Sequence, residues 1–408
     1  MDNYSFLNTA HTSYFEEQYD RYLKAPDTVE PSWRAFFQGF DFGIESGADI
    51  LENEEVPESV RKEFQVIKLI DGYRTRGHLF TKTNPVRERR KYSPTLDIEN
   101  FGLSESDLDT IFNAGSIMGI GPTSLKNIIV HLKKVYCNAI GIEYMYIRDP
   151  KKLSWIQEKL NINVNSPNFS PDEKKHILNK LNQAVSFENF LHTKYVGQKR
   201  FSLEGGESLI PALDSLILAA DDLGVEEFVM GMAHRGRLNT LANIFGKSTK
   251  DIFSEFDGKD YDDDVFDGDV KYHMGWTSKI DPNKDGKKIN ISLAPNPSHL
   301  ETVGAVVQGI ARAKLENKYS SDTSKVLPII VHGDAAIAGQ GLAYEIVQMA
   351  ALKGYSTGGT VHIIVNNQIG FTTNYLDARS STYCTDVGKV TLSPVMHVNA
   401  DDVEAVVH

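Results

Sequence analysis

Cysteine is scarce in this sequence. Cys137 and Cys384 are the only two among 408 residues, and they form no C-x-x-C pair. Two distant thiols provide neither a disulfide framework nor a thiolate zinc site. Long hydrophobic runs are also missing, since no apolar segment approaches the roughly 20 residues that cross a bilayer as a helix. The sequence therefore predicts a protein of a reducing compartment that does not enter the membrane.

Positive charge is the second shortage. The 43 Lys and Arg residues are outnumbered by 55 Asp and Glu, which gives a formal net charge of −12. Nucleic-acid affinity rests largely on Lys and Arg that neutralise phosphates, so we expect no nucleic-acid partner. The first twenty residues contain no Arg and no apolar core, whereas mitochondrial transit peptides are Arg-rich and secretory signals are apolar. A cytoplasmic location is expected.

The length predicts more than one folded unit, because single cores rarely grow beyond about 250–300 residues. Aromatic residues at helical spacing over 11–24 predict an amphipathic arm within residues 1–40. The acidic stretch GIESGADILENEEVPES indicates a linker over 41–58. Helical periodicity, including the segment SDLDTIFNAG at 106–115, then predicts an all-helical region over 59–190.

One boundary in that helical region carries a capping signal. Ser170 and Glu173 have the spacing of a capping box, which predicts that a helix begins there.

The pattern changes in residues 191–408, where short apolar runs alternate with helical segments. The predicted strands are EEFVMGMA, INISLA, LPIIVH and TVHIIV. Strands that alternate with helices of this length imply βαβ units. The predicted fold class is therefore α/β, with a mostly parallel sheet and helices on both faces.

Polar or glycine-rich segments follow each predicted strand. They are His234-Arg235-Gly236-Arg237, Pro295-Asn296-Pro297-Ser298-His299, Gly333-Asp334-Ala335-Ala336 and Asn366-Asn367-Gln368-Ile369-Gly370. Ligands of parallel α/β sheets bind outside the carboxyl ends of strands, so these four loops are candidates for one shared site. The order of the strands does not follow from the sequence.

Asp334 and Asn367 make the strongest pair, because each follows a strand directly and 33 residues separate them, enough for one crossover helix. A carboxylate, a carboxamide oxygen and the main-chain carbonyl of Ile369 form the hard oxygen set that Mg²⁺ prefers. A diphosphate and a water would complete the coordination of this ion. The helix that begins near Gly339-Gln340-Gly341 presents free N–H groups that can bind the same phosphates. Alternatively, Asp334 caps that helix and Asn367 shapes a turn.

The motifs GDAAIAGQG and VNNQIGFTT resemble the cofactor motif of thiamine-diphosphate-dependent 2-oxoglutarate dehydrogenases, although Ala335 stands where many other thiamine enzymes carry a third glycine. Further blocks are similar to that family in the same order. They are FLNTAHTSYFEEQYDRYLKAPDTVEPSWRAFF, IDGYRTRGHL, KYVGQKRFSLEGGESLIPALD, GMAHRGRLNTLANIFGK, DVKYHMG, LAPNPSHLE and LDARSSTYCTDVGK. The resemblance covers nearly the whole chain and implies the thiamine-diphosphate-binding fold.

The resemblance also implies a role for individual residues. Asp334, Asn367 and the carbonyl of Ile369 would bind Mg²⁺ and, through it, thiamine diphosphate. The cofactor would also be lined by Arg235, His273, Ser298, Leu300, Ala335 and Ala336. The substrate would meet the catalytic set His234, His273 and Thr277. Two structural alternatives stay open: Ser298 with Glu301 fits a capping box, and either histidine fits a buried, hydrogen-bonded role.

The implied activity is oxidative decarboxylation of 2-oxoglutarate in the tricarboxylic acid cycle, with transfer of the succinyl group to the lipoyl group of a dihydrolipoyl succinyltransferase. The implied assembly is a homodimer that works with dihydrolipoyl dehydrogenase. Alternatives are a 2-oxoadipate dehydrogenase or 2-oxoglutarate decarboxylase component, and a non-catalytic cofactor-binding module. The glutamate that activates the cofactor in this family is not found before ADDVEAVVH, so we expect the chain to be the N-terminal portion of a longer enzyme.

Two further patterns carry predictions. The aromatic stripe Tyr14, Phe15, Tyr19 and Tyr22 either docks on the acyltransferase or packs on its own body. The segment from Asp281 to Gly286 imitates the start of an EF-hand loop, but its twelfth position is Ser292 instead of Glu. It is therefore predicted to be a polar turn and not a calcium site.

Overall fold

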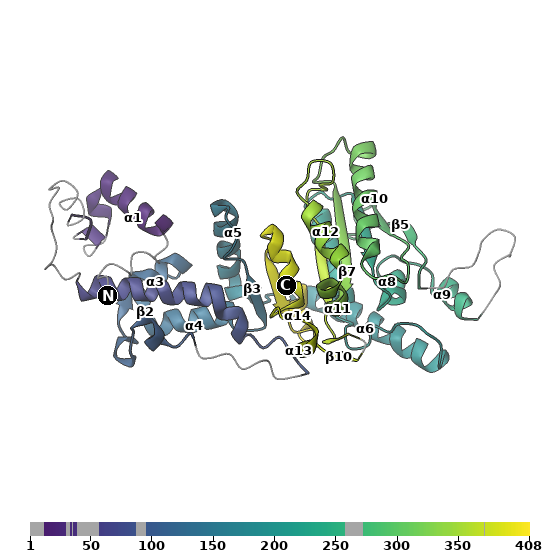
Figure 1. Ribbon diagram of the computed structural model, residues 1–408, viewed down its shortest axis with the longest axis horizontal. Helices are drawn as coiled ribbons and strands as arrows, with labels where there is room; N and C mark the ends of the chain where they lie inside the picture. Colours follow the sequence, from purple (N-terminus) through teal and green to yellow (C-terminus); the bar gives the residue numbers. More distant parts are fainter. Residues whose placement is uncertain are drawn as a thin grey trace. The chain divides into compact units, whose positions relative to one another are not determined.

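The computed structural model describes residues 12–29, 33–34, 36–38, 57–86, 95–257, 272–370 and 372–408. Its internal contacts divide the chain into two units, Met1–Ser166 and Pro167–His408, and each is described by itself (Figure 1). The predicted linker 41–58 lies almost wholly outside the described residues, as do the side chains of Tyr14 and Phe15. The domain boundary expected at 190/191 stays a prediction, and the contact division falls earlier, at 166/167.

The first unit is mainly helical. Its α-helices are α1 (Thr12–Lys24), α3 (Glu58–Arg76), α4 (Leu125–Tyr136) and α5 (Pro150–Asn161). A four-residue strand, β3 (Ile140–Glu143), separates α4 from α5. Buried Phe64, Ile67 and Ile70 of α3 pack in one core with Leu125, Ile128 and Leu132 of α4. The helical spacing of these apolar residues in the sequence therefore reflects a shared core.

The helix expected over 106–115 is wrong. This segment holds a 3-10 turn (Glu105–Asp107) and β1 (Ile111–Phe112), which pairs antiparallel with β2 (Thr123–Ser124). The buried carboxylate of Glu63 accepts hydrogen bonds from the backbone N–H groups of Asn113 (2.7 Å) and Ala114 (3.1 Å). These two residues begin a 3-10 helix (Asn113–Met118), so Glu63 satisfies the free N–H groups at its start and fixes the end of β1 in place of a continuous helix.

Tyr19 and Tyr22, the described half of the aromatic stripe, pack on the arm's own unit. The ring centroids of Tyr19 and Tyr22 lie 5.0 Å and 5.3 Å from that of Phe37, and Trp33 lies 5.5 Å from Phe64 of α3. Tyr19 and Tyr22 are half-buried and also pack against the core that contains Phe64, without any partner. For Tyr19 and Tyr22, packing on the body is therefore confirmed, and docking on an acyltransferase through these two rings is not supported.

The second unit contains a five-stranded sheet in the order β5–β6–β4–β7–β8. The strands are β4 (Glu227–Met232), β5 (Trp276–Ile280), β6 (Ile289–Leu293), β7 (Val326–Gly333) and β8 (Val361–Val365). Strands β6, β4, β7 and β8 run parallel, whereas β5 pairs antiparallel with β6 at one edge. The four predicted strands and the mostly parallel sheet are confirmed; β5 was not predicted.

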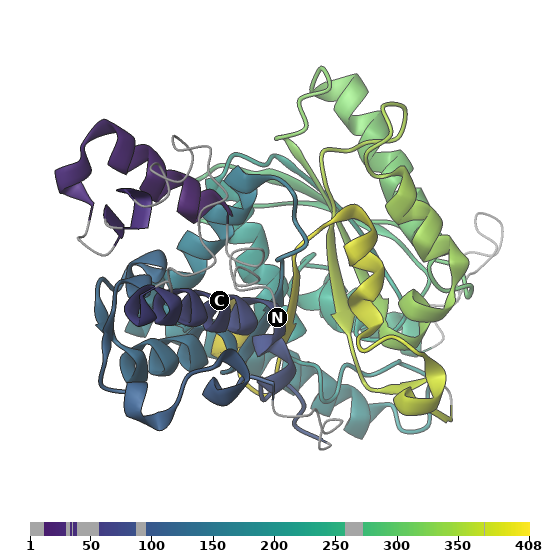
Figure 2. The ribbon, with the colours of Figure 1, turned by 60° about the vertical axis from the view of Figure 1, so that its left-hand side comes forward.

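Helices cover both faces of this sheet. Phe228, Met230 and Met232 of β4 pack in one core that includes α6, α7 and α8, while Val229 of the same strand packs with α10 on the opposite face. Figure 2 shows α10, in green, running along the sheet. The helices are α6 (Pro171–Lys194), α7 (Leu209–Asp222), α8 (Arg237–Asn243), α9 (Thr249–Phe256), α10 (Thr302–Lys318), α11 (Asp334–Gly339), α12 (Gly341–Met349), α13 (Tyr375–Ala378) and α14 (Val403–Val407).

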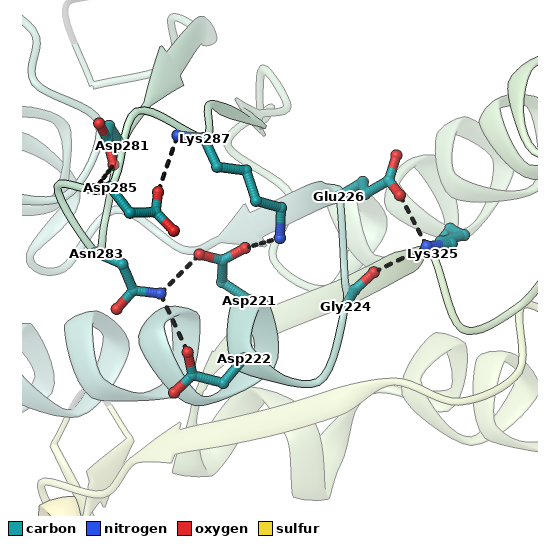
Figure 3. Close-up of polar contacts among 9 residues, drawn as sticks. All are labelled: Asp221, Asp222, Gly224, Glu226, Asp281, Asn283, Asp285, Lys287 and Lys325. Atoms are coloured by element: carbon teal, nitrogen blue, oxygen red, sulfur yellow. Dashed lines mark hydrogen bonds and ion pairs between the residues drawn. The ribbon is translucent and has the colours of Figure 1, made fainter.

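Two local predictions are confirmed in this unit. Ser170 caps α6, since its hydroxyl accepts from the N–H of Glu173 at 3.3 Å and the Glu173 carboxylate accepts from the N–H of Ser170 at 2.7 Å. The EF-hand-like segment is a polar turn in which Asp281 accepts from the N–H of Asp285 and Asn283 donates to Asp221 (Figure 3). Within the described ranges, no helix combines the length and apolar character that membrane crossing requires.

We predict opposite effects for two Gly-to-Ala substitutions, one at the contact between the sheet and α10 and one on the exposed side of α10. A Cβ at Gly231 would lie 2.6 Å from Cγ2 of Val307, whereas a Cβ at Gly309 meets nothing within 4 Å. Gly231→Ala should destabilise the protein by about 1–3 kcal/mol through overpacking. Gly309→Ala should stabilise it by about 0.5–1 kcal/mol, because alanine favours the helix. Urea unfolding measures both, and an unchanged midpoint for Gly231→Ala would contradict the close packing.

Candidate functional site

The parallel register brings the four predicted loops to one edge of the sheet. Met230 pairs with Leu293, Met232 with Val331, and Gly333 with Val365. The chain therefore leaves the sheet on the same side after β4, β6, β7 and β8. The strand order that the sequence left open thus places these loops side by side, as parallel strands require.

His234 and His273 are brought together at this edge. Their rings stack with centroids 5.1 Å apart and planes inclined by 28°. Nε2 of His273 lies 3.3 Å from the hydroxyl oxygen of Ser298. Three of the residues implied by the resemblance therefore form one contact group, contributed by the loops after β4 and β6 and the segment before β5.

The environment of His234 disfavours the protonated form of its imidazole. Burial, and then the charges of His273 and Arg237, lower the pKa of His234 below its usual value. Its Nε2 atom is buried and has no hydrogen-bond partner among the residues that the structure describes. A buried polar atom without a partner is costly, so this nitrogen is a candidate to meet a polar group of a ligand.

Two aromatic rings flank the histidine pair. The ring of Tyr272 lies 5.2 Å from both His234 and His273, and Phe201 lies 4.9 Å from His234. Phe201 adopts a left-handed conformation, with φ of 48°. Neither ring was singled out from the sequence, because only tertiary structure brings residues 201 and 272 together.

The capping box expected for Ser298 and Glu301 is wrong. Helix α10 begins at Thr302, and Glu301 is left-handed, with φ of 73°. The buried carboxylate of Glu301 instead contacts Nδ1 of His332 at 2.6 Å, and Nε2 of His332 lies 2.9 Å from Nδ1 of His362. The long-range contact replaces the local one and joins the loop after β6 to β7 and β8.

Asp334 is the first residue of α11 and only 3% exposed. The alternative expected Asp334 to cap the helix that begins near Gly341, but the N-cap of α12 is Gln340 and no side chain caps it, so this alternative is wrong. Burial raises the pKa of Asp334, and the guanidinium of Arg379, whose Nη1 lies 3.6 Å from the carboxylate, opposes that rise. A buried carboxylate needs a cation as its partner, which here is Arg379 and in the metal assignment would be Mg²⁺.

Asn367 forms part of a tight turn. Its side-chain oxygen accepts from the N–H of Ile369 at 3.3 Å, and Gln368 has a φ of 63°. A Cβ built on Gly370 would lie 2.8 Å from Cβ of Ala335, so the turn lies directly against the start of α11. Asn367 therefore shapes a turn, as the alternative prediction expected. This turn also places Asn367 and Ile369 beside the start of α11, where Asp334 lies.

The other predicted residues are located as follows. Arg235 is exposed, and its Nη1 donates to the carbonyl of Ser202 at 2.9 Å. Leu300 is half-buried after β6, and Ala336 is buried in α11. Thr277 is exposed on β5, opposite Ser292 of β6. The helix expected near Gly339-Gln340-Gly341 begins at Gly341, and no side chain caps it.

The described residues contain no group of three or more His, Cys, Asp or Glu that could hold a metal ion. The predicted Mg²⁺ set does not depend on such a group, because two of its three ligands are amide-type oxygens. Oxygen donors of this kind are what Mg²⁺ prefers, with phosphate and water completing the octahedron. The donor chemistry therefore fits, with Asp334 as the single charged ligand.

Comparisons with known proteins show the family of the chain. The family "Dehydrogenase E1 component" matches residues 179–408, and "2-oxoglutarate dehydrogenase N-terminus" matches residues 4–43. The chain belongs to the dehydrogenase E1 component family. The resemblance stated from its motifs is therefore confirmed.

Several curated relatives share this similarity. The 2-oxoglutarate dehydrogenase E1 component of Cupriavidus necator is 45% identical over 431 residues, covering 99% of this chain and 45% of that protein. The protein of the same name from Azotobacter vinelandii is 40% identical over 431 residues, with 100% and 45% covered. A "Multifunctional 2-oxoglutarate metabolism enzyme" of Mycolicibacterium vanbaalenii is 47% identical over 359 residues, with 86% and 29% covered. The chain thus spans less than half the length of these relatives.

Acid should destabilise the protein by protonating His362, which contacts the buried pair Glu301–His332. Burial and the neighbouring His332 lower the pKa of His362 from 6.5 to about 4, so the folded protein binds fewer protons than the unfolded chain between these values. The stability contributed by neutral His362 is present above pH 6.5 and is lost as the pH falls towards 4, by up to about 3 kcal/mol. His362→Asn, whose amide can take the place of Nδ1, should flatten this pH dependence in urea unfolding.

The matched control for that experiment is His176→Asn on the exposed surface of α6. Equal pH dependence in the wild type and His362→Asn would show that His362 does not cause the acid sensitivity.

Proposed function

We propose that this chain binds thiamine diphosphate through Mg²⁺ and takes part in oxidative decarboxylation of 2-oxoglutarate, with the succinyl group passed to a lipoyl group. The observation that carries this proposal is the meeting of two loops at one sheet edge. The buried carboxylate of Asp334 and the turn from Asn367 to Gly370 follow neighbouring parallel strands. The names of the curated relatives support the choice of substrate.

The residues of this chain would divide the work by position. Asp334, Asn367 and the carbonyl of Ile369 would hold the metal ion and so orient the diphosphate, while Ala335 and Ala336 would line it. Ser298, Leu300 and Arg235 would line the same cofactor from the other loops. When bound, thiamine diphosphate would supply the electron sink for loss of carbon dioxide. For the metal ion to bind, the carboxylate of Asp334 would have to leave its ion pair with Arg379 or contact both cations at once.

The histidine pair would recognise the substrate. His234 and His273 present ring nitrogens at the edge of the site, and a 2-oxo dicarboxylate needs donors for its distal carboxylate. Thr277 would add a hydroxyl from the neighbouring strand. Tyr272 and Phe201 flank the pair and would provide apolar surface beside the substrate.

The same proposal includes partners. A dihydrolipoyl succinyltransferase would accept the succinyl group, and dihydrolipoyl dehydrogenase would complete the complex, with this chain in a homodimer in the cytoplasm. The term "E1 component" in the relatives' names supports work within a larger assembly.

Asp334→Ala and Asn367→Ala should each abolish Mg²⁺-dependent binding of thiamine diphosphate, because each removes one oxygen from a small and geometrically strict metal shell. Asn366→Ala is the matched control, since Asn366 also shapes this turn by accepting from the N–H of Gln368 at 3.0 Å but is not a proposed ligand. Titration calorimetry on the active assembly measures the affinity. Undiminished binding by either ligand variant would refute the metal assignment.

Substitution of the histidines should affect substrates unequally. His234→Ala or His273→Ala should lower kcat/KM for 2-oxoglutarate by about tenfold or more, and less for 2-oxobutyrate, which lacks the distal carboxylate. Steady-state kinetics with both substrates, and with 2-oxoadipate for the alternative specificity, decide the matter. His176→Ala on α6 serves as the control. Equal losses on both substrates would assign these histidines to the cofactor instead.

A further inference from the structure

Arg237 is a fully buried cation in the middle of the strand-end loops. Its side chain is 0% exposed, and it follows Gly236, whose φ of 75° turns the chain into α8. The guanidinium donates through Nη2 to the carbonyls of Met274 at 2.7 Å and Ala294 at 2.8 Å. Longer contacts reach the carbonyls of Met232 at 3.4 Å and His273 at 3.5 Å.

These carbonyls belong to three separate segments of the chain. Met232 ends β4, Ala294 follows β6, and His273 and Met274 precede β5. A planar guanidinium with several fixed donors can bond diverging carbonyls at once, whereas a lysine presents one nitrogen. Arg237 therefore ties the segment that carries His273 to the ends of the two strands beside it.

A buried cation in this place carries a desolvation cost. Burial lowers the pKa of Arg237 to about 10, which still leaves it charged at neutral pH. Its described hydrogen-bond partners are all carbonyl oxygens. Apolar side chains of similar volume often replace buried charges without loss of stability. The guanidinium of Arg237, buried among the loops of the candidate site, points to a role in that site.

A second observation shows that the His273 segment is held closely. A Cβ built on Gly275 would lie 2.8 Å from the carbonyl oxygen of Leu293 and 2.8 Å from Cδ of Pro295. The N–H of Asn296 also donates to the carbonyl of His273 at 3.1 Å. The backbone before β5 is therefore clamped between Arg237 on one side and the loop after β6 on the other.

We propose that Arg237 is a positioning residue for the 2-oxo acid: it holds the backbone of His273 so that the imidazole stays opposite His234, and it places a fixed positive charge behind this pair. This inference rests on the proposed function. Arg237 touches neither substrate nor cofactor in this account. It acts through His273 and through its field, which favours a substrate with a second carboxylate.

The test separates the charge of Arg237 from its geometry. In the active assembly, Arg237→Met should lower kcat/KM for 2-oxoglutarate by about ten- to hundredfold and lower kcat/KM for 2-oxobutyrate less. The reason is that the buried carbonyls lose their hydrogen-bond donor and the fixed positive charge is removed. Arg237→Lys keeps the charge and should preserve more of the preference for 2-oxoglutarate. Affinity for thiamine diphosphate should fall less than activity on 2-oxoglutarate, because Asp334, Asn367 and Ile369 would hold its diphosphate through the metal ion.

A double-mutant cycle with His273→Ala tests the route of the effect. If Arg237 acts through His273, substituting Arg237 should cost much less activity in the His273→Ala background than in the wild type. Should Arg237→Met fail to fold, the cycle is run with Arg237→Lys. The matched control is Arg312→Met, which removes a guanidinium that also donates to a carbonyl, that of Ser356 at 2.9 Å, away from the site.

The outcomes are distinguishable. If the wild-type assembly does not use 2-oxoglutarate, the proposed function fails before the variants are compared. If it does, but Arg237 substitutions lower activity equally on both substrates and additively with His273→Ala, the positioning role is overturned. Loss of the substrate preference together with a non-additive cycle supports it.

Discussion

Parallel pairing of β6, β4, β7 and β8 is the constraint on which the candidate site depends. Because parallel strands all end at one edge of the sheet, loops separated by more than 100 residues in the sequence lie together there. The helices between these strands are buried on opposite faces and leave that edge to the loops. The chemistry of the site is therefore a consequence of sheet topology, with side chains supplied by loops.

Buried polar contacts hold those loops in register with each other. The pair Glu301–His332 joins the loop after β6 to the strand that presents Asp334, and Arg237 joins the end of β4 to the segment carrying His273. Such contacts are costly to desolvate and weak sources of net stability. Their concentration at one edge of the sheet fits a site in which geometry is maintained at the expense of stability.

Much of this arrangement could be predicted from residues. Apolar runs of strand length gave four of the five sheet strands, and family motifs gave His234, His273, Asp334 and Asn367. The antiparallel edge strand β5 was missed because its residues alternate in burial without a continuous apolar run. The Ser298–Glu301 capping box failed because the local pattern competes with a long-range contact that sequence spacing does not reveal.

Residues that support the site were harder to find. Arg237 and Arg379 stand inside recognised motifs, but an arginine in a motif does not disclose whether its guanidinium faces a ligand, carbonyls or a carboxylate. The two rings around the histidines come from positions 201 and 272, which only the fold brings together. Sequence patterns predict which loops carry chemistry, whereas the partners of each side chain depend on tertiary packing.

The most direct test of the account is a structure of the active assembly with thiamine diphosphate and Mn²⁺ in place of Mg²⁺. The anomalous signal of manganese locates the metal without reference to any assumed ligand. The account predicts one peak within about 2.3 Å of a carboxylate oxygen of Asp334, the side-chain oxygen of Asn367 and the carbonyl oxygen of Ile369. A cofactor bound with its metal elsewhere, and Asp334 still paired with Arg379 alone, would contradict it.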